Sequence, residues 1–503
     1  MSVVLFSLSS RKNNDSIALS SLLRGCIIVF IILAYILCLL QYVFGFQFHA
    51  DAWTYILIFA FSIFLYHFVG ESKKQYENIM RLGIGFLVII SFLQYVLMLI
   101  VFPLGFVGVE RRELYSVQEF NRAILIFGFL LFVFYTGIKS TTFFSSKRSP
   151  VTKGPFLSNL TKVKTTLYII AYLSLIIKIY LAIKMGWVMG RNWESGWIER
   201  LLPTSLYSYM LALLLMWYGK NLPVKDRKII GGYFFLLVIW GLSYGSRAGI
   251  YSVLKLFLIT GIILHGKNLK IPKRLIKAMA VVGLPVGAII WILASYIRGS
   301  GDWRMVFNFT DIIFALVAAL MRLGVSTSNY IMAINDWGNY KNIASMFTIS
   351  NIVKAGINGF VPGDIFNTPF TDTGNLWEFF MYNEPLGLRV MGEVWSGFGF
   401  YYVLYRYWVI LVVFLWALVS TLIMRFLTVR KTLFSSLIAV SFFNIYIWDF
   451  FEKGRLDATI TDTLLIGSYM LIFYIILVLI VGATAHKKAI GFSKGSRGIH
   501  CGY

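Results

Sequence analysis

Long apolar runs, separated by short charged segments, constrain the fold of this chain more than any other feature of its sequence. A membrane-spanning helix needs about 20 mostly apolar residues, and twelve runs of that kind follow one another here. The pattern therefore predicts an all-α, polytopic integral membrane protein with about 12 transmembrane helices. The runs lie near residues 26–43, 53–70, 83–108, 123–138, 165–188, 203–219, 229–245, 250–265, 278–297, 401–424, 432–448 and 463–485.

Composition excludes a soluble protein. Of the 503 residues, 58% are hydrophobic and only 14% are charged, whereas about 25% of residues are charged in a typical soluble domain. Arg11, Lys12 and Arg24 precede the first apolar run, and no small-residue cleavage site follows it. We therefore expect this run to be a retained first span rather than a removed signal peptide.

The net charge of +24 is distributed unevenly between the segments that join the apolar runs. If the N-terminus is cytoplasmic, the segments assigned to the cytoplasm hold 28 Lys and Arg against 4 Asp and Glu, and the outer segments hold 14 against 18. The positive-inside rule predicts this asymmetry. We expect both termini to be cytoplasmic, and the basic clusters to face anionic lipid headgroups rather than nucleic acid. The cytoplasmic segments are 1–25, 71–82, 139–164, 220–228, 266–277, 425–431 and 486–503, and the outer ones are 44–52, 109–122, 189–202, 246–249, 298–400 and 449–462.

A long insertion divides the chain into three parts. Residues 1–297 hold nine predicted helices, 298–400 form a large loop on the outer side of the membrane, and 401–503 hold three more helices and a basic tail. Within the loop, 310–325 is apolar but short and contains Asp311 and Arg322. If it spanned the membrane, the last three spans would invert and violate the charge pattern. We therefore expect an interfacial or re-entrant helix there.

The insertion combines aromatic residues with carboxylates, amides and glycines, which is the composition that a sugar-binding cleft requires. Aromatic rings stack on the apolar faces of sugars, and carboxylates and amides bind the hydroxyls. Loops of this length are commonly functional. For any single tryptophan, an interfacial aromatic belt is the alternative interpretation. The segments are Arg298–Arg304, Asn358–Gly363, Asp372–Glu378 and Gly387–Gly399, which include Asp302, Trp303, Asn375, Trp377 and Trp395.

A second candidate feature is the short outer turn Gly245-Ser246-Arg247-Ala248-Gly249. The planar guanidinium of an arginine can bind phosphate oxygens bidentately, and the small neighbours leave room for a bulky headgroup. Alternatively, Arg247 extends to lipid phosphates without a substrate role. Lys255, eight residues later on the same helical face, and Lys178 lie inside predicted spans. Intramembrane lysines face a cavity or a partner, so each could hold a diphosphate or pair with a carbonyl or carboxylate.

Several familiar chemistries lack their sequence motifs. The chain has no Walker loop, dinucleotide fingerprint or zinc-type histidine pair. Its five histidines are scattered, and none lies within 298–400, so an acid or base in the insertion should be a carboxylate. The three cysteines predict neither a disulfide framework nor a metal cluster. We expect no cofactor and no metal.

The dozen spans, the turn at 245–249 and the late loop ending in Gly392-Glu393-Val-Trp395-Ser-Gly-Phe-Gly399 resemble the Wzy-type O-antigen or oligosaccharide repeat-unit polymerases. The resemblance covers nearly the whole chain. It implies a GT-C-like membrane glycosyltransferase of the bacterial inner membrane that uses undecaprenyl-diphosphate-linked oligosaccharides. The growing glycan would move from its lipid carrier to the non-reducing end of a new lipid-linked unit, without a nucleotide sugar. A polysaccharide chain-length regulator is an expected partner.

The resemblance also implies roles for residues of the outer side. Glu393 is the expected catalytic carboxylate, with Asp372 as a further candidate, and each would orient or deprotonate the acceptor hydroxyl. Arg247 would stabilise the charge that develops on the leaving diphosphate. The residues expected to bind substrate are Arg298, Arg304, Arg322, Arg389, Lys255, Glu378, Glu384, Trp377 and Trp395.

Two other functions remain open. An O-antigen ligase uses the same donor, but its family resemblance includes a histidine in the long periplasmic loop, which 298–400 lacks. A flippase for the lipid-linked unit should show internal repeats and short loops. This sequence shows no repeated halves and concentrates its charged residues in one outer loop.

Overall fold

The computed structural model describes most of the predicted helices and little of the insertion. The described residues are 16–48, 50–101, 116–144, 156–184, 204–218, 222–243, 248–278, 348–361, 365–368, 397–429, 433–454 and 456–472, with single residues or short pieces at 281, 283, 285–287, 289, 292, 304, 307–308, 312, 331, 334–335, 346 and 475.

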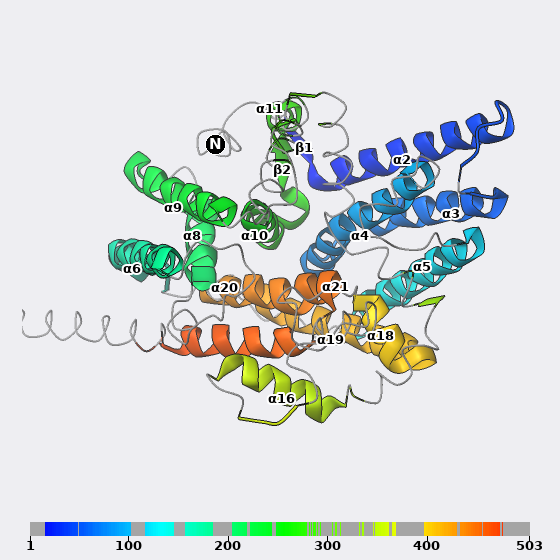
Figure 1. Cartoon of the computed structure of the whole chain (residues 1–503). Coiled ribbons are helices and arrows are strands. Elements are labelled where there is room, and N and C mark those ends of the chain that lie inside the picture. The colour runs from blue at the N-terminus through cyan, green and yellow to red at the C-terminus, as the bar shows by residue number, and fades with distance from the viewer. Residues whose placement is uncertain are drawn as a thin grey trace, which may run out of the picture.

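The described part of the chain is a bundle of helices (Figure 1). A helix occupies eleven of the twelve predicted segments, and 278–297 is described only in pieces. The main helices are α2 (Leu19–Tyr42), α3 (Ala52–Phe68), α4 (Gln75–Val101), α5 (Val117–Ser140), α6 (Phe156–Lys184), α8 (Thr204–Tyr218), α9 (Val224–Ser243), α10 (Ala248–His265), α18 (Gly397–Tyr405), α19 (Val409–Val429), α20 (Leu433–Phe442) and the helix 456–472.

Length and hydropathy identify an all-α membrane protein. Among the described residues, five helical stretches are long and apolar enough to cross a membrane, and two further apolar helices are shorter. Large apolar side chains such as Val29 of α2 and Ile63 of α3 are more than half exposed, as expected on a surface that faces lipid. The five stretches are Leu19–Tyr42, Gln75–Leu97, Val117–Ser140, Tyr401–Val429 and Phe434–Glu452, and the shorter helices are Ala52–Phe68 and Thr204–Trp217.

Contacts at one end of the bundle join segments that the charge pattern assigns to the cytoplasm. A two-stranded antiparallel ladder is an addition to the predicted all-α fold: β1 (Ser16–Ala18) pairs with β2 (Lys270–Pro272), just before α11 (Lys273–Ala278). The other contacts are Lys139 Nζ to Glu77 Oε2 at 2.9 Å, Lys164 Nζ to Asp226 Oδ2 at 2.6 Å, and Arg425 Nη1 to the Phe144 carbonyl at 2.9 Å. These segments therefore lie together, as predicted.

Contacts between the segments assigned to the outer side form a second set. They include two contacts made by the insertion, through Asn335 and Gly356. The contacts are Asn121 Nδ2 to Asp51 Oδ1 at 2.9 Å, Asn335 Nδ2 to the Glu119 carbonyl at 3.1 Å, and Thr461 Oγ1 to the Gly356 carbonyl at 2.8 Å. The insertion thus contacts the starts of α5 and of the helix 456–472, and the start of α5 contacts the start of α3. The sequence assigns all of these segments to the outer side.

Two predicted loops contain helix. The predicted outer segment 449–462 is wrong as a loop, because helix continues through Lys453 and resumes at residue 456. Gly454, at φ +64°, makes the intervening turn in the left-handed region that glycine tolerates. Within the insertion, α16 (Ile349–Phe360) begins at the N-cap Thr348, whose hydroxyl accepts from the Asn351 N–H.

The predicted interfacial helix at 310–325 lies almost wholly outside the described residues. Ile312 is described, and its N–H donates to the Asn308 carbonyl at 3.0 Å. The two residues are four apart in sequence, which is the separation of hydrogen-bonded residues in an α-helix.

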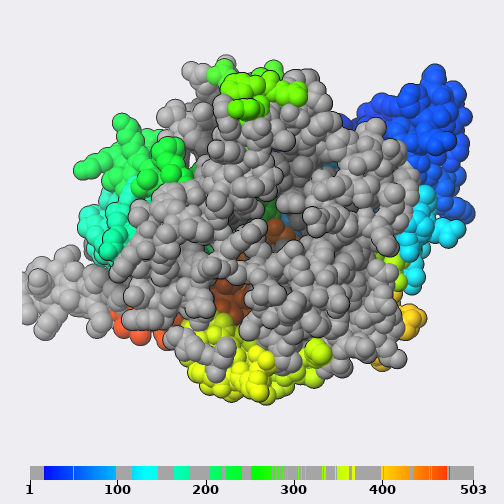
Figure 2. Space-filling view, in the orientation of Figure 1, coloured from blue at the N-terminus to red at the C-terminus, as the bar shows by residue number. Residues whose placement is uncertain are grey.

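Helix α16 packs against the first turns of 456–472. A Cβ at Gly356 would lie 2.7 Å from the Ile460 side chain, so the two helices approach closely. In Figure 2 the yellow-green atoms of α16 lie at the surface, whereas the orange atoms of α20 and its neighbours lie deep.

Helices α5 and α19 pack closely at Gly137. A Cβ added there would lie 2.7 Å from the Phe414 carbonyl and 2.8 Å from the Ala417 Cβ. We predict that Gly137→Ala destabilises the purified protein by about 1–3 kcal/mol, because backbone atoms must move to admit the methyl group. Thermal unfolding in detergent would measure this loss.

The matched control is Gly467→Ala. Gly467 lies in the helix 456–472, and a Cβ there would meet no atom within 4 Å. Its substitution gains helix propensity without a clash, so the midpoint should stay level or rise. Equal midpoints for the two variants would contradict the close packing of α5 on α19.

Candidate functional site

Helix α20 changes its hydrogen-bonding pattern deep in the bundle. After Phe442 it continues as the π-helix η10 (Phe443–Asp449) and then as α21 (Phe450–Lys453). In an α-helix, residues five apart point about 140° away from each other, but the i to i+5 bond of a π-helix brings them onto one face. Asn444 Nδ2 accordingly donates to Asp449 Oδ2 at 3.1 Å. Single π-turns of this kind frequently occur at functional sites.

Lys255 of α10 forms an ion pair with the carboxylate of Asp449. Their side chains are 10% and 14% exposed, so both charges are largely removed from solvent. Lys255 lies seven residues after Ala248, the first residue of α10, which corresponds to about 10 Å along the helix. Because a buried charge is very costly without a partner, the pair couples α10 to η10.

Asn444 connects this pair to a third helix. Its Nδ2 also donates to Tyr209 Oη at 2.7 Å. Tyr209 belongs to α8 and lies five residues after Thr204, the first residue of that helix, or about 8 Å along its axis. Asn444 and Tyr209 are both buried. The side chains from α8, α10 and η10 therefore meet at a similar depth.

Trp448 adds a second carboxylate. Its Nε1 lies 3.2 Å from Tyr251 Oη and 3.1 Å from Glu452 Oε2, and it can donate to both. The indole is fully buried and packs against Phe86 of α4, with ring centroids 5.8 Å apart. Glu452 is 9% exposed. We call these residues the buried polar cluster: Tyr209, Tyr251, Lys255, Asn444, Trp448, Asp449 and Glu452.

The cluster places an ion pair, Lys255 with Asp449, and a second carboxylate, Glu452 at Trp448, in a medium of low dielectric. Electrostatic interactions are much stronger there than in water, so the cluster can stabilise a polar or charged group or transfer a proton. Intramembrane ionisable residues usually indicate a functional site. The alternative is a structural role in which the cluster fixes the register of three helices. Its position in the first turns of α8 and α10 separates it from the basic end of the bundle.

The structure describes two of the predicted site residues. Lys255 is largely buried and pairs with a carboxylate, which is one of the two alternatives given above for it. Arg304 is exposed on a short helical turn. Lys178, the second lysine singled out above, donates to Thr204 Oγ1 at 3.4 Å. The remaining predicted residues lie outside the described ones: Glu393, Arg247, Asp372, Arg298, Arg322, Arg389, Glu378, Glu384, Trp377 and Trp395.

The sequence contains a signal for the rest of the cluster. Asn444, Trp448 and Glu452 recur every four residues, so they share one face of a helix. Asp449 was assigned to a loop, although it immediately follows an apolar run. A polar stripe on one apolar run and a lysine in another are the pattern expected of an intramembrane pair.

The described residues contain no group of three or more His, Cys, Asp or Glu side chains that could hold a metal ion. Comparison of the chain with protein-family models, with curated proteins and with solved structures gave no match.

We predict that Lys255→Met destabilises the protein by about 3–5 kcal/mol, because it leaves the buried Asp449 carboxylate without its cation. The double variant Lys255→Met/Asp449→Asn should recover most of this loss, since it removes both charges. Thermal unfolding of the purified protein in detergent would test both. Lys225→Met, at an exposed lysine of α9, is the control. A double variant as unstable as the single one would contradict the pairing.

Proposed function

We propose that this chain is a polymerase of undecaprenyl-diphosphate-linked oligosaccharide repeat units. It would cross the bacterial inner membrane twelve times in a GT-C-like arrangement, with both termini in the cytoplasm and the insertion 298–400 in the periplasm. The reaction would extend O-antigen or capsule chains. Its partners would be the two lipid-linked glycans, the surrounding membrane lipids and a chain-length regulator.

The observation that supports this proposal best is the burial of Lys255 and two carboxylates in the half of the bundle that is nearest the insertion. Lys255 and Tyr209 lie in the first turns of α10 and α8. The described parts of the insertion contact the starts of α5 and of 456–472. Both substrates carry lipid tails, so their diphosphates must enter at the membrane surface, close to such a site.

The proposed reaction divides the work between cations and a carboxylate. The anomeric C–O bond to the diphosphate breaks, and the acceptor hydroxyl oxygen forms the new glycosidic bond. The hydroxyl proton passes to a carboxylate, for which Glu393 is our first candidate and Asp372 the second. Undecaprenyl diphosphate leaves with the bonding electrons. Arg247, which immediately precedes α10 in sequence, would stabilise the charge on it.

Lys255 would act at the inner limit of the same site. Its ammonium already pairs with Asp449. It would therefore act through the electrostatic field of the ion pair and would not bind the diphosphate directly. Arg298, Arg304, Arg322 and Arg389 would bind diphosphate, while Glu378, Glu384, Trp377 and Trp395 would bind the sugars. The exposed position of Arg304 is compatible with this role.

A flippase for the same lipid-linked unit is the second candidate, and one observation favours it. Transporters often place charged residues where an intramembrane helix departs from regular α-helical bonding, and the π-helix η10 does so beside the Lys255–Asp449 pair. An O-antigen ligase would use the same donor with lipid A-core as the acceptor.

A deletion strain separates these functions. Without a polymerase, cells should make lipopolysaccharide or capsule carrying a single repeat unit, visible as the loss of the ladder on a gel. A flippase deletion should give no surface repeat at all, and a ligase deletion should leave polymer on its lipid carrier. Glu393→Gln and Arg247→Ala should each reduce polymerisation by about 10²-fold or more at unchanged protein level. A full ladder in the deletion strain would refute the polymerase.

Sidedness can be tested with single cysteines in a background that lacks Cys26, Cys38 and Cys501. Lys267, after α10, and Ser350, in α16, are both exposed. In cells with a permeable outer membrane, an impermeant maleimide should label Ser350→Cys at once and Lys267→Cys only after lysis. The reverse pattern would place the insertion in the cytoplasm, where the proposed acceptors are absent.

A further inference from the structure

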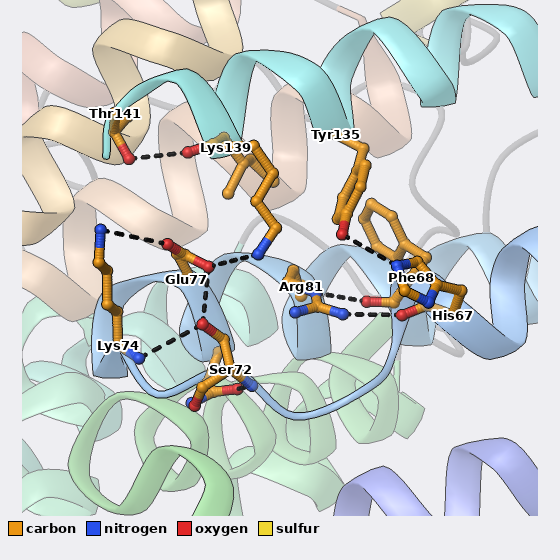
Figure 3. Close-up of polar contacts among 11 residues, drawn as sticks. His67, Phe68, Ser72, Lys74, Glu77, Arg81, Tyr135, Lys139 and Thr141 are labelled. Atoms are coloured by element: carbon orange, nitrogen blue, oxygen red, sulfur yellow. Dashed lines mark hydrogen bonds and ion pairs between the residues drawn. The ribbon is translucent and has the colours of Figure 1, made fainter. Parts of the chain in front are cut away.

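Two arginines converge beside Gly70, at the end of α3. Arg81 of α4 is almost fully buried, at 3% exposure. Figure 3 shows its guanidinium bonded to the last turn of α3: Nε donates to the Phe68 carbonyl at 2.6 Å, and Nη2 donates to the His67 carbonyl at 2.7 Å. These carbonyls form the negative end of the α3 dipole. The charge of Arg81 is therefore partly compensated by the backbone.

Arg24 of α2 has no comparable compensation. Its guanidinium lies over the ring of Tyr66, 4.8 Å from the centroid, and its Nε is buried without a hydrogen-bond partner. Among the described residues, no carboxylate or carbonyl accepts a hydrogen bond from it or pairs with it. A Cβ at Gly70 would lie 2.5 Å from Arg24 Nη2 and 3.3 Å from Arg81 Nη2, so both guanidinium groups occupy the space beside this glycine.

The nearby carboxylates already have other partners. Glu77 Oε2 accepts from Lys139 Nζ at 2.9 Å and from Ser72 Oγ at 2.7 Å, as Figure 3 shows. Glu71 Oε1 accepts from Ser20 Oγ at 3.3 Å. The end of α3 thus carries more positive than negative side chains, so an anion bound beside the partly buried Arg24 guanidinium would be stabilised.

We propose that Arg24 and Arg81, whose guanidinium groups converge beside Gly70, form a binding site for a phosphate group. Arg24 supplies the planar donor set that fits phosphate oxygens bidentately, and Arg81 adds a second positive charge that α3 holds in place. The site lies at the basic end of the bundle, where Lys74 and Lys139 also lie. The phosphate can come from an anionic lipid headgroup or from free inorganic phosphate.

The test measures binding to the purified full-length protein in detergent. Phosphatidylglycerol is the anionic probe, phosphatidylethanolamine the zwitterionic lipid and inorganic phosphate the soluble probe, with native mass spectrometry and thermal shift as readouts. We expect Arg24→Gln to weaken phosphatidylglycerol binding about tenfold, and Arg24→Lys to weaken it less, because lysine keeps the charge without the planar fork. Arg274→Gln, at an exposed arginine of α11, should bind as the wild type does.

A second variant keeps both charges. Gly70→Ala should also weaken binding, since its Cβ would collide with Arg24 Nη2 and with the His67 carbonyl. Millimolar inorganic phosphate that competes with the lipid would identify a site for phosphate itself, and failure to compete would identify the lipid headgroup. Both results support the proposal. Equal lipid binding by the wild type and Arg24→Gln would overturn it.

Discussion

A charge inside a membrane protein must find its counter-charge within the protein, because neither lipid nor a packed core can solvate it. In this bundle the requirement falls on Lys255 and Asp449, which come from helices 194 residues apart in sequence. Their pairing depends on a local departure from α-helical geometry. The π-helix turns Asp449 onto the face of Asn444, and Asn444 in turn reaches Tyr209 of α8. Three helices are thereby held in one register by polar groups.

The same requirement is met differently at the basic end of the bundle. There the helix termini themselves provide acceptors, and Arg81 binds the last carbonyls of α3 instead of a carboxylate. Glu77, only 1% exposed, is held by Lys139 and Ser72. Positive charge at this end therefore has a structural use as well as a topological one. The two ends differ in chemistry. At the basic end Arg81 is compensated by helix carbonyls, whereas nearer the insertion Lys255 is compensated by a carboxylate.

The sequence predicted the helices well, because about 20 consecutive apolar residues admit few alternatives in a membrane. It also predicted which connecting segments lie together, since charge asymmetry is a property of each short loop. It did not predict the partner of Lys255, because that contact is long-range and depends on a π-turn that periodicity does not show. The ladder between β1 and β2 and the helix α16 were missed for a related reason. Each is short, and its stability comes from packing against distant parts of the chain.

The pairing of β1 with β2 has a consequence for the order of assembly. Ser16–Ala18 cannot acquire their partner until Lys270–Pro272 have been synthesised, after the helices from α2 to α10. The first helix therefore enters the bilayer without the ladder that finally fixes its base. A nascent chain stopped before α10 would keep that edge unpaired and open to other strands. Synthesis of β2, just after α10, is the step that supplies the partner of β1.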